Sequence, residues 1–328
     1  MTVSSVQEST GRENAPRHGG QLLVDQLAAE GVSRAFCIPG ESYLAALDGF
    51  VGSGIDLVVC RQEGGAAMMA EAYAKLTGRP GICFVTRGPG ATNASPGLHI
   101  AFQDSSPMIL FIGQVAREQV DREAFQEIDY RRMFEQLTKW TGQIEDAARV
   151  PEYVSRAFHN ATAGRPGPVA IALPEDMLRD AVEAAVGTPW RTPEIAPTPD
   201  DMKRFEEMLA GSERPVMIVG GSRWSQDTAE RLAAFCADND MPVCTSFRCQ
   251  DFIDNTAPAY MGVSGIGPDP ELVRRITTAD LVICVGARLG EMTTGRYSHF
   301  DIPRPKQTLI HVYPDPEEIG RVYQADLG

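Results

Sequence analysis

The sequence predicts an α/β fold in which two doubly wound, mostly parallel-sheet domains are joined by a Pro-rich linker. Apolar runs of strand length alternate with segments of helical periodicity along most of the 328 residues, and glycine or proline separates many of them. Strands that alternate with helices require crossover connections, which produce a largely parallel sheet covered on both faces. The alternation lapses between Pro174 and Pro199, which predicts a boundary in a chain long enough for two domains.

The first domain is predicted over residues 18–188, after a polar tail (residues 1–17) that we predict to be disordered. Its first helix, Gln21–Glu30, has apolar residues at helical spacing, and Gly31 supplies a helix-terminating residue. The elements predicted after it are strand Arg34–Ile38, helix Leu44–Phe50, strand Ile55–Cys60, helix Gly64–Thr77, strand Gly81–Thr86, helix Thr92–Phe102, strand Met108–Ile112, helix Pro151–Ala163 and strand Pro168–Leu173.

Residues 189–199 form the predicted linker, because the four prolines in this short segment favour an extended chain. The second domain is predicted over residues 200–328, and its last helix, Glu317–Tyr323, is short. Residues 325–328 resemble the opening of a further strand, so we expect a fragment of a longer chain, truncated within the last strand of this domain. The other elements are helix Asp200–Leu209, strand Pro215–Val219, helix Asp227–Asp238, strand Pro242–Thr245, helix Pro270–Thr277, strand Leu281–Val285 and strand Thr308–Val312.

Charge and composition exclude several classes of protein. A formal net charge of −14 disfavours nucleic acid and anionic membrane surfaces as partners. No apolar run approaches the roughly 20 residues that a membrane helix requires, and the polar start does not resemble a secretion signal. The seven cysteines include no C-x-x-C pair and predict buried thiols in a cytoplasmic protein. The five scattered histidines give no metal-ligand spacing, which argues against a zinc enzyme.

Glu63 is the first candidate site residue, because it follows an apolar strand at the point where a helix begins. Ligands of open α/β sheets bind outside the carboxyl ends of strands, although a glutamate here also suits a helix cap or the helix dipole. The helix after it, Gly64–Ala74, is built almost wholly from small residues. Such a helix favours either tight internal packing or a subunit interface, and both alternatives stay open.

The turn Thr86–Asn93 (TRGPGATN) joins a strand to a helix, and its glycines permit close approach of backbone N–H groups and a ligand. It lacks the lysine of a phosphate-binding loop and the spacing of a dinucleotide fold. Taken alone, it is better interpreted as a tight structural turn.

Taken in order, these segments resemble a known family. FCIPGES, CRQEGGAAMMAEAYAKLTGRPG, TRGPGATN, AFQDSSPMILFIGQV and GRPGPVAIALPED are similar to the pyrimidine-binding and central domains of the acetolactate synthase and 2-oxo acid decarboxylase family. The resemblance runs from about His18 to Gly328 and is most specific between Ile38 and Val115. It implies thiamine diphosphate and Mg²⁺ as cofactors.

The resemblance implies a catalytic role for Glu63. A protonated Glu63, hydrogen-bonded to N1′ of the aminopyrimidine, would favour the imino form of the cofactor, which removes the proton from C2 of the thiazolium. The resemblance also implies softer assignments for nine other residues. They are Pro39, Gly40, Gly88, Pro89 and Gly90 for cofactor binding, and Glu41, Ser42, Thr86 and Gln114 for the substrate pocket.

Three departures from the family pattern refine this expectation. Thr86 stands where benzoylformate-type decarboxylases place a histidine, which favours a synthase-like site. FAD in the central domain is left open, since Gly286-Ala287-Arg288 match whereas Leu289-Gly290-Glu291 and Ser264 do not. The sequence contains no Gly-Asp-Gly, so we expect the ligands of Mg²⁺ and of the diphosphate to come from a missing C-terminal domain, with no metal ligand in this chain.

The expected function is therefore condensation of 2-oxo acids, such as pyruvate, with loss of CO₂. A 2-oxo acid decarboxylase or acyl-CoA lyase is the alternative enzyme, and a non-catalytic nucleotide-binding protein is the alternative outside catalysis. Family members form their sites between subunits, so a homodimer or homotetramer is expected, with self-association through the face that carries Gly64–Ala74.

Overall fold

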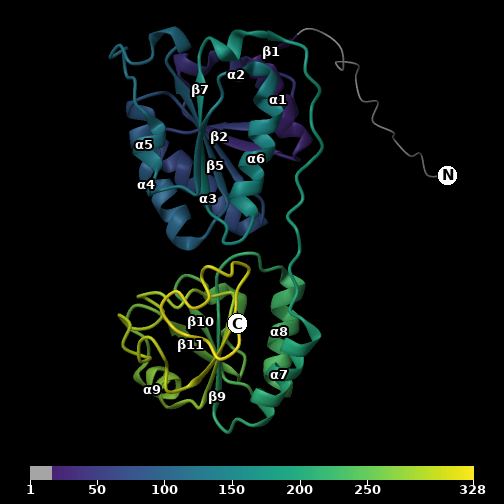
Figure 1. Ribbon diagram of the computed structural model, residues 1–328, viewed down its shortest axis with the longest axis vertical. Coiled ribbons are helices and arrows are strands. Elements are labelled where there is room, and N and C mark those ends of the chain that lie inside the picture. The colour runs from purple at the N-terminus through teal and green to yellow at the C-terminus, as the bar shows by residue number, and fades with distance from the viewer. Residues whose placement is uncertain (1–16) are drawn as a thin grey trace, which may run out of the picture. The chain divides into compact units, whose positions relative to one another are not determined.

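The computed structural model describes residues 17–328, which fold into two compact units (Figure 1). The first unit contains the described residues up to Thr162 together with Gly167–Thr192, and the second contains Ala163–Pro166 and Pro193–Gly328. Each unit is built on a parallel sheet with helices on both faces, which confirms the predicted α/β class. Residues 1–16 of the predicted tail lie outside the described residues.

The main sheet of the first unit has six parallel strands. Two neighbouring strands inside the sheet, β5 and β7, are buried along all seven of their residues, as expected for parallel strands covered on both faces. They run in register from the pair Met108 and Pro168 to the pair Gln114 and Pro174. In sheet order the strands are β3 (Asp56–Val59), β2 (Arg34–Cys37), β4 (Gly81–Val85), β5 (Met108–Gln114), β7 (Pro168–Pro174) and β6 (Trp140–Gln143).

Two layers of helices cover this sheet, and Figure 1 shows α1 and α6 on one side with α4 and α5 on the other. Side chains alternate between the layers: Ile109 and Phe111 of β5 join the core under α1, α2 and α6, whereas Leu110 and Ile112 join the core under α3, α4 and α5. The helices are α1 (Gly19–Ala29), α2 (Leu44–Phe50), α3 (Glu63–Thr77), α4 (Pro89–Asp104), α5 (Tyr130–Phe134) and α6 (Val150–Thr162).

The two ends of the first unit are tied together. Strand β1 (Arg17–His18) pairs antiparallel with β8 (Ala181–Val182), so Arg17, predicted as part of the tail, is ordered. Residues 183–198 have no helix or strand. Within them, Trp190 donates from its backbone N–H to Glu30 at 2.7 Å and from Nε1 to Thr162 at 3.2 Å. The first residues of the predicted linker are therefore bound to this unit, and a linker role for residues 189–199 stays a prediction.

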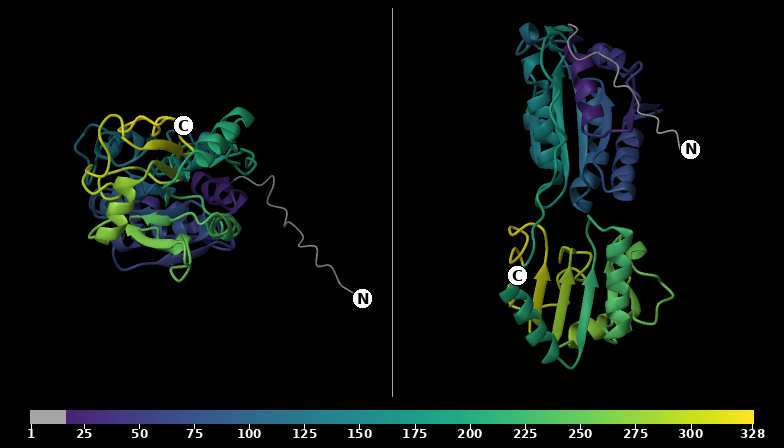
Figure 2. Two further views of the ribbon diagram at one scale, coloured as in Figure 1. Left: turned by 90° about the horizontal axis from the view of Figure 1, so that it is seen from below. Right: turned by 90° about the vertical axis from the view of Figure 1, so that its right-hand side faces the viewer.

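The second unit contains a five-stranded parallel sheet (Figure 2). Helices α7 and α8 pack on one face through residues such as Phe205 and Cys236, and α9 packs on the other through Leu272 and Ile276. In sheet order the strands are β11 (Tyr260–Ser264), β10 (Val243–Ser246), β9 (Pro215–Val219), β12 (Leu281–Val285) and β13 (Thr308–Val312); the helices are α7 (Pro199–Ala210), α8 (Gln226–Asp238) and α9 (Pro270–Thr278).

One predicted element is wrong. Residues 317–323 form turns instead of the predicted helix, because Gly320 adopts a left-handed φ of +84° in the middle of the segment and interrupts helical hydrogen bonding. Close to the end of the chain, Leu327 forms a parallel bridge with Ile310 of β13. This is the place where the sequence predicts the opening of another strand.

The structure also bears on the predictions about cysteines and about membrane helices. All seven cysteines are free, and six of them are buried while Cys60 is half-buried, as predicted from their apolar surroundings. Within residues 17–328, no helix is both long enough and apolar enough to cross a membrane.

Candidate active site

The residues predicted for the site follow the strands of the first unit. Pro39–Ser42 follow β2, Glu63 follows β3, and Thr86–Gly90 follow β4, while Gln114 is the last residue of β5. Because these four strands are parallel neighbours, their carboxyl ends meet at one edge of the sheet. The sequence-predicted residues are therefore gathered at the edge where open α/β sheets bind ligands.

Glu63 is the first residue of α3, and its side chain is half-buried. The helix cap comes from the preceding residue, since Gln62 Oε1 accepts a hydrogen bond from the backbone N–H of Gly65 at 2.9 Å. Glu63 instead accepts a bond from Asn93 Nδ2 on α4, at 3.1 Å from its Oε2. The carboxyl group is thus held by a neighbouring helix and does not cap its own helix.

The small residues of α3 face the interior of the same unit. Ala67 and Ala70 are fully buried, and a Cβ added to Gly97 of α4 would lie 2.4 Å from the Cβ of Ala67. Small side chains therefore allow α3 and α4 to approach closely, as in the internal-packing alternative. The interface predicted on Gly64–Ala74 stays a prediction: Ala70 is covered within its own unit, whereas Met68 and Met69 of the same segment are exposed, as is Leu76 farther along α3.

Thr86 lies at the centre of the loops after β2 and β4. Its Oγ1 and Ser42 Oγ are 2.8 Å apart, within hydrogen-bond distance. A Cβ added to Gly40 or to Gly90 would lie 2.5 Å or 2.9 Å from the side chain of Thr86. Both glycines are therefore needed for packing around Thr86, and a cofactor-binding role for Pro39, Gly40 and Gly90 stays a prediction.

Gly88 has a conformation that requires glycine, with φ +61° and ψ −111°. Its N–H donates to the hydroxyl oxygen of Tyr130 at 2.8 Å, and an added Cβ would lie 2.7 Å from the Cβ of Gln126. Burial raises the pKa of Tyr130 to about 12, although the Gly88 bond and nearby Arg87 act in the opposite direction. Tyr130 is therefore a neutral hydroxyl that fixes the turn before α4. Pro89, the first residue of that helix, is exposed.

Gln114 is buried, with both ends of its amide bonded to backbone. Its Oε1 accepts from the N–H of Val115 at 2.9 Å, and its Nε2 donates to the carbonyl of Ile128 at 2.8 Å. These bonds close the segment between β5 and α5. Gln114 thus shapes the loop of the predicted substrate side, and direct contact with a substrate stays a prediction.

The structure adds four residues that the sequence did not single out. Asn93 binds Glu63, Tyr130 binds Gly88, and Arg87 forms an ion pair with Glu175 at 3.0 Å. A polar residue inside or just after a glycine-rich turn was a signal for Arg87 and Asn93. Tyr130 and Glu175 lie on later segments that only the fold brings to this edge, so no local pattern identifies them.

The carboxyl edge of the second unit is closed by its own glycine turns. A Cβ added to Gly221, which has φ +82°, would lie 1.9 Å from the carbonyl oxygen of Gly286, and Trp224 Nε1 donates to the carbonyl of Gly220 at 2.8 Å. Ser264, which departs from the flavin-type pattern, is buried and donates to the carbonyl of Thr293 at 2.7 Å. Both glycine turns are therefore tight, and nucleotide binding at them stays a prediction.

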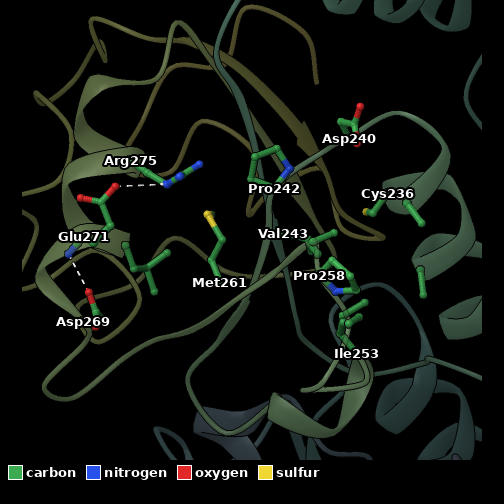
Figure 3. A pocket seen from close by; sticks show the side chains of 15 residues that line it. Cys236, Asp240, Pro242, Val243, Ile253, Pro258, Met261, Asp269, Glu271 and Arg275 are labelled. Carbon is green, nitrogen blue, oxygen red and sulfur yellow. Dashed lines mark hydrogen bonds and ion pairs between the residues drawn. The ribbon is translucent and has the colours of Figure 1, made fainter.

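A cavity of about 740 Å³ lies elsewhere in the second unit, between α8, α9 and the first residues of β10 and β11 (Figure 3). Cys236, Val243 and Met261 line it, with the Glu271–Arg275 ion pair on its wall. None of the predicted site residues lines this cavity, which opens at the amino ends of the strands. The constellation around Glu63 is the better candidate site, because it lies at the carboxyl ends of the strands.

Both units match domains of known proteins. Residues 17–133 match the thiamine pyrophosphate enzyme N-terminal TPP binding domain, and residues 202–328 match the thiamine pyrophosphate enzyme central domain. The chain is 34% identical to a probable acetolactate synthase large subunit of Methanocaldococcus jannaschii and 32% identical to the acetolactate synthase isozyme 2 large subunit of Escherichia coli. It is 31% identical to the acetolactate synthase large subunit of Corynebacterium glutamicum.

These alignments cover 94%, 94% and 100% of this chain but 53%, 56% and 54% of the three relatives, so the chain spans about half of their length. The first match covers strands β2–β5 of the first sheet, including the edge that carries Glu63, and the second covers all five strands of the second sheet. The chain therefore belongs to the thiamine pyrophosphate enzymes, and it carries their N-terminal binding domain and their central domain.

Proposed function

We propose that the chain is part of a thiamine-diphosphate-dependent enzyme that joins 2-oxo acid units with loss of CO₂, with pyruvate as substrate. Two points support the proposal: the relatives are named acetolactate synthases, and Glu63 lies at the ligand-binding edge of the sheet with Asn93 as its partner. The second observation carries it, because it concerns the acid that this chemistry requires.

The residues at this edge fit the aminopyrimidine of thiamine diphosphate. The carboxyl group of Glu63 is half-buried and makes one side-chain hydrogen bond within residues 17–328, so it retains capacity to bond a ring nitrogen. When bound, thiamine diphosphate supplies a nucleophilic carbon that attacks the ketone carbonyl of a 2-oxo acid. Glu63 would hold a proton at N1′ of the ring, and Asn93 would fix the direction of that carboxyl group.

Thr86 and Ser42 favour the synthase over a decarboxylase with a histidine in this loop. Their hydroxyl groups are 2.8 Å apart and provide neutral hydrogen-bonding groups at the position of Thr86, where an imidazole would serve as a proton carrier. A decarboxylase or acyl-CoA lyase of the same family remains the alternative activity.

The expectations for Mg²⁺ and for FAD rest on different parts of the chain. Within residues 17–328, no group of three or more His, Cys, Asp or Glu side chains is arranged to hold a metal ion. We propose that Mg²⁺ is held by groups other than these residues, as the family resemblance implies. Gly221 leaves no room for a Cβ beside the carbonyl oxygen of Gly286, and FAD binding at this turn stays a prediction, as does the alternative of a nucleotide-binding protein without catalysis.

We also propose that the protein is a homo-oligomer in which the exposed side chains of α3 are covered. Met68, Met69 and Leu76 are 42%, 41% and 87% exposed on the helix that begins with Glu63. Large apolar side chains grouped on one helix favour a protein partner. A second copy would also cover Glu63, which one unit leaves half-buried.

The experiment measures C2 hydrogen–deuterium exchange of bound thiamine diphosphate in the protein expressed from its complete reading frame. Glu63→Gln keeps the shape of the side chain and cannot transfer a proton, so exchange and pyruvate turnover should slow by about 10²–10⁴-fold. The control is Glu71→Gln, two turns along α3, where the buried carboxylate accepts a bond from Ser106 at 2.7 Å. Glu71→Gln should lower stability and leave exchange unchanged. Normal exchange in Glu63→Gln would end the catalytic assignment.

A further inference from the structure

Arg87 connects separate loops at the edge that carries the proposed site. Its side chain is 12% exposed, and its Nη1 donates to Glu175 Oε2 at 3.0 Å in the loop after β7. Its Nε donates to the carbonyl oxygen of Phe125 at 3.1 Å, in the segment between β5 and α5. One guanidinium group therefore joins segments separated by up to 88 positions in the sequence.

The backbone and the second Nη atom of Arg87 extend this connection to the loop after β2. The N–H of Arg87 donates to Ser42 Oγ at 3.3 Å, and Nη2 lies 3.9 Å from Glu41 Oε1. Four loops thus meet at one residue. A guanidinium can do this because its donors point in fixed, separate directions, whereas a lysine ammonium is a single flexible charge.

The segment 115–129 depends on such outside contacts, because its own backbone is unfavourable. Asp121, Glu123 and Gln126 have positive φ values of 64°, 52° and 65°, which non-glycine residues adopt only when surrounding structure holds them. Phe125 is 73% exposed, and Gln126 Oε1 is buried with no hydrogen-bond partner within the described part of the chain.

Gln126 also packs against the turn that precedes α4, the helix whose Asn93 is bonded to Glu63 of α3. A Cβ added to Gly88 would lie 2.7 Å from Gln126, and α4, which begins one residue later, carries Asn93 with its bond to Glu63. Displacement of segment 115–129 would therefore first move the loops that carry the predicted substrate-pocket residues. The position of the Glu63 carboxyl group would change only through Gly88 and α4.

We infer that Arg87 is a positioning residue of the proposed active site: it fixes segment 115–129 above the strand ends so that the 2-oxo acid binds in one orientation. The role toward substrate rests on the proposed function. The structural part, in which Arg87 fixes the segment, is independent of it.

The first measurement is hydrogen exchange in the 328-residue chain. Arg87→Met removes the guanidinium and Arg87→Lys keeps the charge, and both should speed exchange of amides in segment 115–129 about tenfold or more, as expected when charge-assisted hydrogen bonds are lost. Exchange in α3 should not change. The control, Arg34→Met, removes an ion pair with Asp56 (2.9 Å) at the opposite edge of the same sheet and should leave segment 115–129 unchanged. Unchanged exchange in both Arg87 variants would overturn the inference.

The second measurement uses the protein expressed from its complete reading frame. Arg87→Lys should raise the KM for pyruvate or lower kcat/KM by about 10–100-fold through misplacement of the substrate side, while C2 exchange of bound thiamine diphosphate stays within about twofold. Faster exchange of segment 115–129 with unchanged KM and kcat would overturn the positioning role. If the wild-type protein consumes no 2-oxo acid, the proposed function fails, and the hydrogen-exchange result still decides whether Arg87 fixes the segment.

Discussion

The contact between α3 and α4 gives a sharp test of packing at the site, through Gly97→Ala. An added Cβ would lie 2.4 Å from the Cβ of Ala67, about 1 Å closer than ordinary contact, and 2.9 Å and 3.0 Å from backbone atoms of Ala67 and Met68. Because backbone atoms cannot rotate away, we expect an overpacking cost near the upper end of about 1–3 kcal/mol. The higher helix propensity of alanine offsets roughly 1 kcal/mol. The net loss of unfolding free energy should be about 2 kcal/mol.

The assay is urea denaturation followed by fluorescence in a Trp224→Phe background, where Trp140 and Trp190 report on the first unit alone. With a urea dependence of about 2 kcal/mol per molar, the midpoint of Gly97→Ala should fall by about 1 M. Gly65→Ala is the matched control, since the nearest atom to its added Cβ is 4.0 Å away and alanine should stabilise this helix by about 0.5–1 kcal/mol. Equal midpoints for the two variants would refute the packing argument.

Two further predictions concern buried polar groups. Tyr130→Phe leaves the N–H of Gly88 without its acceptor and should cost about 1–3 kcal/mol in the same first-unit assay; an unchanged midpoint would contradict the role given to this hydroxyl. In the second unit, burial lowers the pKa of His311, while its bond to the carbonyl of Ala287 acts in the opposite direction. As the pH falls, the unfolded chain protonates His311 near pH 6.5, before the folded protein does. The free energy of unfolding therefore declines below about pH 6.5, and the decline continues until the pH reaches the lower pKa of the folded state. His311→Gln should reduce this decline in a chain with Trp224 as the sole tryptophan, and an equal decline in variant and wild type would exclude His311 as its source.

Several elements are predictable to the residue because they combine an apolar run with clear boundaries. Buried parallel strands read as continuous apolar segments, and proline or glycine marks their ends. The failures have equally local causes: α5 has five residues, β6 carries polar residues at a sheet edge, and Gly320 interrupts the segment predicted as a helix. The elements with matching bounds are Leu44–Phe50, Pro215–Val219, Leu281–Val285 and Thr308–Val312.

The candidate site was predictable only where strand ends are visible in the sequence. Glu63 follows an apolar strand and starts a helix, so its position at the carboxyl edge follows from the alternation of elements. The cap made by Gln62 and the bond from Asn93 depend on rotamers and on the distance between α3 and α4. The connection from Arg87 to Glu175 depends on which strand lies beside β5, and sheet order has no local signature in the sequence.

The order of strands in the first sheet also determines how this unit can form during synthesis. Strand β5 ends at residue 114, yet its neighbour β7 begins at residue 168, and β6 joins the sheet only through β7. Until residue 174 has left the ribosome, one edge of β5 lacks its partner, and seven residues that are all buried in the fold stay accessible. An unpaired apolar strand edge is a template for pairing with other chains. The nascent chain is therefore vulnerable to aggregation while residues 115–174 emerge from the ribosome, which is the interval in which a chaperone would protect it.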